Sequence, residues 1–147
     1  MIDISNTSSN QQQTIAKPVS ILGIGLHTGA KVNMKLYPAK VDYGIKFIRK
    51  DIKDNNLIEA LWSNVSSTKL STTISNQYGN SVSTVEHLMS ALSGLHIDNI
   101  KIEIDGPEVP IMDGSSIKFV DLIDQTSTQS LNTVSYTHLT LPTIYSV

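Results

Sequence analysis

The spacing of apolar residues changes once along this chain, and that change constrains the fold more than any other feature. Residues 32–37 alternate Val, Met and Leu with Asn and Lys, and residues 44–49 repeat this period of two. Such alternation predicts half-buried strands. From Val85 to Leu95, apolar side chains recur at the i, i+3, i+4, i+7 and i+10 positions, which form the apolar stripe of a helix. The chain is therefore expected to form strands first and a helix later.

The other patterned segments extend this order. Further strands are expected within residues 14–24, 58–65, 70–75, 81–84 and 97–104. The third and fourth of these flank a Gly-containing loop and predict a hairpin. A second helix is expected over residues 117–123. This order predicts an α+β fold, a two-layer sandwich in which a mainly antiparallel sheet of five to six strands carries two helices on one face, rather than a βαβ repeat.

The two ends differ in composition from the middle. Residues 1–13 are mostly Ser, Thr, Asn and Gln without a period, which predicts a disordered leader. They lack the pattern of a secretory signal, and no apolar run approaches the ~20 residues needed to span a bilayer, so a cytoplasmic location without a membrane span is expected. No charged residue follows Asp124. Residues 126–147 are expected to be an artefactual or disordered tail, because residues 135–143 resemble a translated library adaptor; a natural polar, β-prone tail is the alternative.

Composition excludes several functions. The formal charge is −2, from 11 basic and 13 acidic residues, which argues against a nucleic-acid binder. The chain has no cysteine. Disulfides, thiolate zinc sites and cysteine nucleophiles are therefore excluded, and any metal site must use His, Asp or Glu.

A cluster of glycines over residues 23–29 is similar to a dinucleotide-binding fingerprint. Its last spacing is one residue too long, and a strand pattern follows it. A dinucleotide site would instead need a helix whose N-terminus holds the pyrophosphate. The cluster therefore predicts a glycine-rich bend between two strands.

Glu86 and His87 are the strongest candidates for chemistry. They lie in the first turn of the expected helix, where the helix dipole favours an ionised carboxylate and a neutral, metal-binding imidazole. Ser83 has the spacing to form a capping box with Glu86. In that alternative Glu86 only caps the helix and His87 is an ordinary surface or packed histidine. The residues alone leave both interpretations open.

Four segments in order carry a family resemblance: residues 23–29, 83–88, 94–100 and 110–115. Together they resemble the UDP-3-O-acyl-N-acetylglucosamine deacetylases, zinc-dependent enzymes of bacterial lipid A biosynthesis. The resemblance covers roughly residues 13–124, and it implies that residues 14–125 form the N-terminal domain of such an enzyme.

The resemblance also implies roles for individual residues. Glu86 would be the general base that acts on a zinc-bound water, and His87 would be one of three protein ligands to Zn²⁺. Leu70 and Ser71 would line the substrate-binding wall near the metal. His27 belongs to the family signature, but the resemblance assigns it no role.

One part of the family pattern is missing. The resemblance places the other zinc ligands in a His-x-x-x-Asp pair of a C-terminal domain, and no His in this chain is followed by Asp four residues later. We therefore expect the first half of an enzyme, inactive alone, whose substrate is a UDP-3-O-acyl-N-acetylglucosamine. The alternative is a stand-alone, non-catalytic α/β binding module that kept the fold.

Overall fold

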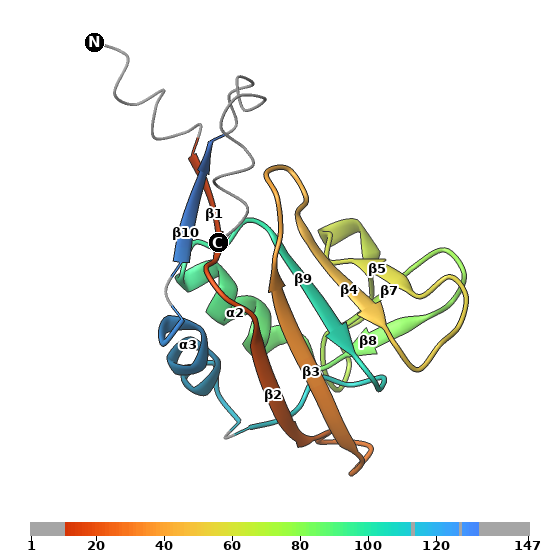
Figure 1. Cartoon of the computed structure of the whole chain (residues 1–147). Coiled ribbons are helices and arrows are strands. Elements are labelled where there is room, and N and C mark those ends of the chain that lie inside the picture. The colour runs from red at the N-terminus through yellow and green to blue at the C-terminus, as the bar shows by residue number, and fades with distance from the viewer. Residues whose placement is uncertain (1–10, 113, 127, 133–147) are drawn as a thin grey trace.

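A five-stranded sheet is the framework of the computed structural model, which describes residues 11–112, 114–126 and 128–132 (Figure 1). Its strands, in spatial order, are β2 (Val19–Ile24), β3 (Lys31–Pro38), β9 (Ile100–Ile104), β4 (Ile45–Arg49) and β5 (Leu57–Glu59). Strands β4 and β9 run parallel, and the other neighbouring pairs are antiparallel. The sheet is therefore mixed, with one parallel pair among antiparallel ones.

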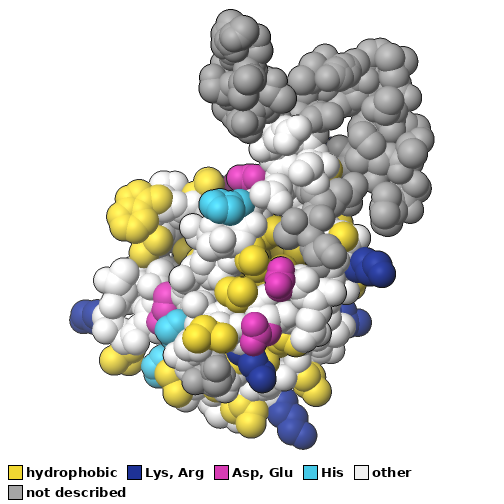
Figure 2. All heavy atoms as spheres, turned by 90° about the vertical axis from the view of Figure 1, so that its left-hand side faces the viewer, with side chains coloured by type: hydrophobic (Ala, Val, Ile, Leu, Met, Phe, Trp, Pro, Cys, Tyr) yellow, Lys and Arg dark blue, Asp and Glu magenta, His cyan; other side chains and the backbone are white. Residues whose placement is uncertain are grey.

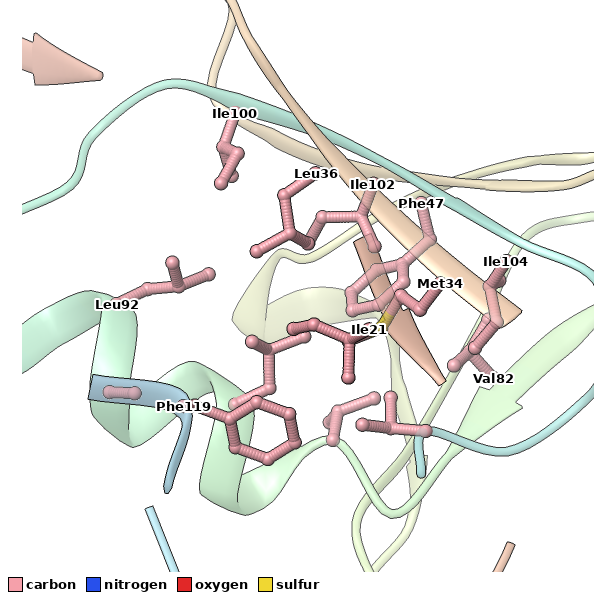
Figure 3. Packing of buried hydrophobic residues seen from close by; sticks show 14 of the residues in the cluster. Ile21, Met34, Leu36, Phe47, Val82, Leu92, Ile100, Ile102, Ile104 and Phe119 are labelled. Carbon is pink, nitrogen blue, oxygen red and sulfur yellow. The ribbon is translucent and has the colours of Figure 1, made fainter. Parts of the chain in front are cut away.

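Two helices pack on one face of this sheet, α2 (Glu86–Gly94) and α3 (Ile117–Asp124). Alternate residues of β3 and β9 are buried, as a period of two requires. Figure 3 shows the side chains of the sheet pointing toward Leu92 of α2 and Phe119 of α3, so the core lies between the two layers. The expected α+β sandwich with two helices on one face is confirmed.

A smaller antiparallel sheet adjoins the entrance to α2. It consists of β6 (Val65–Ser67), β7 (Thr73–Ser75) and β8 (Ser81–Ser83). The hairpin expected around the Gly-containing loop is confirmed, because β7 and β8 pair directly. The single strand expected over residues 58–65 is wrong. That segment divides into β5 and the 3₁₀ turn η1 (Trp62–Asn64), where Trp62 is exposed and adds no side chain to the core.

Two short strands lie at the boundaries of the expected leader and tail. Strand β1 (Gln11–Ile15) pairs antiparallel with β10 (Thr128–Asn132). The last residues assigned to the leader and some assigned to the tail therefore have regular backbone structure. Residues 1–10 and 133–147 lie outside the described residues, so their disorder and the artefactual origin of the tail remain predictions. Within the described ranges, no helix is long and apolar enough to cross a membrane.

Candidate functional site

The entrance to α2 differs from a capped helix. Thr84 has a φ of 59°, a left-handed conformation that is rare for a β-branched residue, and it turns the chain out of β8. The N-cap position is Val85, and no side chain caps the helix. The alternative of a capping box between Ser83 and Glu86 is therefore wrong. Ser83 is held in β8, where its hydroxyl accepts a hydrogen bond from the Thr73 hydroxyl at 3.2 Å.

Glu86 is consequently available for another role. Its Oε1 accepts a hydrogen bond from the backbone N–H of Thr72 at 3.1 Å, while Oε2 has no hydrogen-bond partner among the described residues. The side chains of Glu86 and His87 are both partly exposed. The sequence left two interpretations of Glu86 open. The structure excludes the one in which its carboxylate only caps the helix.

A cleft of about 380 Å³ lies between the glycine-rich bend and residues 67–73. One wall comes from residues 67–73, which include Leu70 and Ser71, and the other comes from His27, Thr28 and Glu108. Leu70 is 85% exposed. Thr72, the residue bonded to Glu86, lies between two residues of the first wall. The structure therefore brings Leu70, Ser71 and His27 to one cleft, whereas Glu86 and His87 do not line it. Glu86 is linked to the first wall through its hydrogen bond with Thr72.

The glycine-rich bend connects β2 to β3 and supplies His27 and Thr28 to the cleft. The backbone N–H of Gly25 donates to the carbonyl of Ala30 at 2.9 Å, and β3 follows at once, so the expected bend is confirmed. A side chain at Gly25 would not fit, since a Cβ there would lie 2.5 Å from Oε1 of Glu108. Figure 2 shows histidine, acidic and exposed apolar side chains spread over one face of the molecule.

Glu108 is the residue of this region that sequence reasoning missed. It is 1% exposed, and it accepts hydrogen bonds from two segments that are distant in sequence. The donors are the backbone N–H groups of His27 and Thr28, the Nδ1 of His27 at 2.8 Å and the hydroxyl of Thr84 at 2.8 Å. The only sequence signal was an acidic residue between Pro107 and the apolar Val109.

These hydrogen bonds determine the charge of Glu108. Burial raises the pKa of its carboxyl, but the hydrogen bonds from the His27 backbone, the Thr84 hydroxyl and the Thr28 backbone outweigh that effect. The pKa falls from 4.5 to about 2. Glu108 is therefore an ionised, buried acceptor over the whole physiological range.

This lowered pKa predicts an acid-sensitive contribution to stability. The pKa is lower in the folded state, so the stabilisation is complete above the unfolded value of 4.5 and is lost as the pH falls toward about 2. This difference between the unfolded and the folded pKa corresponds to about 3 kcal/mol in the free energy of unfolding. Urea unfolding of the wild type and of Glu108→Gln at several pH values between about 2 and 6 measures it. The difference in unfolding free energy between the two proteins should shrink as the pH falls, and a constant difference would contradict the assignment.

The described residues contain no group of three or more His, Cys, Asp or Glu side chains that could hold a metal ion. A catalytic zinc site needs three protein ligands. Glu86, His87 and His27 therefore do not make a complete zinc site within this part of the chain.

Comparisons with known proteins agree with the motifs. A family model described as UDP-3-O-acyl N-acetylglycosamine deacetylase matches residues 12–144. A UDP-3-O-acyl-N-acetylglucosamine deacetylase of Myxococcus xanthus (strain DK1622) is 50% identical over 116 residues, which are 79% of this chain and 37% of that relative. The protein of the same name from Syntrophotalea carbinolica is 52% identical over 115 residues, or 78% of this chain and 37% of the relative. The protein of the same name from Syntrophus aciditrophicus is 46% identical over 112 residues, which are 76% of this chain and 35% of that relative. The chain thus spans about a third of the length of the curated relatives that it matches.

Proposed function

Because the chain belongs to the UDP-3-O-acyl N-acetylglycosamine deacetylase family, we propose that it is the N-terminal part of a zinc-dependent amidohydrolase. That enzyme would remove the N-acetyl group from a UDP-3-O-acyl-N-acetylglucosamine during lipid A biosynthesis in the cytoplasm. The observation that carries the proposal is the state of Glu86. Its carboxylate belongs to the family motif, is not used for capping, and is hydrogen-bonded to Thr72, which lies between two residues that line the cleft.

In this proposal Glu86 is the general base. The hydrogen bond from Thr72 fixes one carboxylate oxygen, and the other oxygen accepts the proton of the attacking water. Leu70 and Ser71 form the substrate wall. Support for this comes from the cleft, which they line, and from the high exposure of Leu70, an apolar side chain that a substrate group could cover.

His87 would contribute one of the zinc ligands. It lies in the first turn of α2 and its side chain is partly exposed, so the imidazole is accessible to a metal ion. The described residues do not supply the other ligands, so we assign them to the C-terminal domain of the complete enzyme. No catalytic step through zinc follows from this chain alone.

A second candidate function is a non-catalytic binding module. The metal site favours it, because the described residues form the fold and the cleft but contain no group of three side chains that could hold a metal ion. The two candidates differ in what they require: the enzyme needs the rest of the family sequence, whereas the binding module does not.

Zinc binding separates these candidates. We define the chimera as the Myxococcus xanthus relative with its aligned 116 residues replaced by the corresponding part of this chain. The isolated chain should bind zinc weakly, and the chimera should bind one zinc ion tightly. His87→Ala should weaken binding to the chimera by more than about 100-fold, because even residues that only support a ligand contribute 10–100-fold.

Competition with a metal-binding dye measures both affinities. His96→Ala is the matched control, because His96 follows the C-terminus of α2, at the other end of the helix from His87. Unchanged zinc affinity in the His87→Ala chimera would show that His87 is not a ligand. Tight stoichiometric binding by the isolated chain would contradict the incomplete site.

A further inference from the structure

The contact between His27 and Glu108 has no role in the proposed function. Nδ1 of His27 lies 2.8 Å from Oε2 of Glu108, whose side chain is 2% exposed, while the His27 side chain is 38% exposed. The imidazole therefore has one edge against a buried carboxylate and the other toward the surface. Both residues line the cleft.

The carboxylate decides which ring nitrogen carries a proton. An ionised carboxylate only accepts hydrogen bonds, and Glu108 is ionised at neutral pH. Nδ1 must therefore be the donor in the 2.8 Å contact. This holds for the neutral ring and for the charged ring, because both then have a proton on Nδ1. In the neutral ring Nε2 is left as an acceptor.

We propose that Glu108 is a positioning residue that fixes the Nδ1-protonated form of His27 and so presents Nε2 to the cleft as the acceptor for an O–H or N–H group of the ligand. This inference deepens the proposed function and rests on it for the identity of the ligand. It gives His27 a role as a binding residue that acts at the wall opposite Leu70 and Ser71.

The surrounding backbone is built around this carboxylate. A bend between two strands does not need a buried acid, and burying a charge is costly unless it is fully paired. Here the cost is offset by donors from both the bend and the entrance to α2. Gly25 leaves the space that the carboxylate fills. Thr84 keeps a strained conformation and donates its hydroxyl to Oε2, and such strain is a mark of functional regions.

The tautomer can be measured directly in the 147-residue chain. Long-range ¹H–¹⁵N correlation spectra of His27, recorded where its ring is neutral, should show a protonated Nδ1 and an unprotonated Nε2. In Glu108→Gln the amide can present its NH₂ group to the ring, so the proton should move to Nε2. A wild-type His27 with the proton on Nε2, or with rapid exchange between the two nitrogens, would overturn the proposal even if no variant folds.

Thr84→Val is the matched control for this measurement. It removes a different hydrogen bond to the same carboxylate oxygen while keeping the shape of the side chain. The tautomer of His27 should remain unchanged in Thr84→Val. A loss of the tautomer in both variants would show that Glu108 only stabilises the local fold, and would contradict a positioning role.

Kinetics of the chimera test the binding role. His27→Ala and Glu108→Gln should each raise KM by about two- to tenfold, the effect of one lost hydrogen bond, with a smaller change in kcat. The double variant should be no worse than His27→Ala alone, because Glu108 acts through His27. If the two substitutions raised KM multiplicatively in the double variant, Glu108 would not act through His27. The NMR experiment requires no turnover, so an inactive chimera would count against the proposed function without changing the result for the tautomer.

Discussion

Glu86→Gln should lower kcat of the chimera by about 10²–10⁴-fold, the usual contribution of a general base. The amide oxygen of Gln can still accept the hydrogen bond from Thr72, so the position of the side chain should be preserved. Its nitrogen cannot accept a proton, so only the proton transfer is lost. KM should change little, since the base acts on the attacking water rather than on the bound substrate. Initial rates of acetate release at several substrate concentrations give both constants.

Glu59→Gln is the matched control for this substitution. Glu59 lies in β5, its side chain is 45% exposed, and its ion pair with Lys46 is long at 4.0 Å. Removing such a surface charge should leave kcat unchanged. If kcat of Glu86→Gln equalled that of Glu59→Gln, Glu86 would not be the base.

Phe47→Ala should lower the free energy of unfolding by about 3–5 kcal/mol, the cost of a large cavity in a packed core. Phe47 is 0% exposed and lies opposite Ile102 in the parallel pair of β4 and β9. Its ring is at the centre of the packed side chains in Figure 3. The substitution therefore removes a large buried side chain from the parallel strand pair, whose register the sequence did not predict.

Urea unfolding monitored by circular dichroism measures this loss. Trp62→Ala provides the comparison, because Trp62 is 87% exposed and its removal should change stability by less than about 0.5 kcal/mol. Equal losses for the two variants would show that β4 does not pack as described.

Helices and strands with one buried face were predicted from the spacing of apolar residues within their own segment. The apolar stripe from Val85 to Leu95 predicted α2, which runs from Glu86 to Gly94, because one buried helix face needs that period. Strands β3 and β4 were predicted for the same reason, since one face of each is buried. Beyond the end of α2 at Gly94, the left-handed conformation is taken by His96, with a φ of 58°.

Strand pairing between segments that are distant in the sequence could not be predicted from the spacing of apolar residues. The parallel alignment of β4 with β9, which begins with Ile45 opposite Ile100, depends on the whole sheet. The pairing of β1 with β10 joins the two ends of the described chain. Neither segment carries a local signal for its partner, because the main-chain hydrogen bonds of a ladder are independent of side-chain identity.

The site was predicted only in part, for a related reason. Glu86 and His87 are adjacent and could be found as a motif, and the family resemblance joined Leu70 and Ser71 to them. Glu108 could not be found in this way, because its four donors come from the glycine bend and from Thr84. A single Glu is usually a surface residue, and only the folded chain shows that this one is buried.

Acetate release from a UDP-3-O-acyl-N-acetylglucosamine is the most direct test of the central claim, that this chain is the N-terminal part of a deacetylase whose general base is Glu86. The assay compares the isolated chain, the chimera, and the chimera with Glu86→Gln. We predict release by the chimera alone. Turnover by the isolated chain, or by the Glu86→Gln chimera at the rate of the unmodified chimera, would contradict the account.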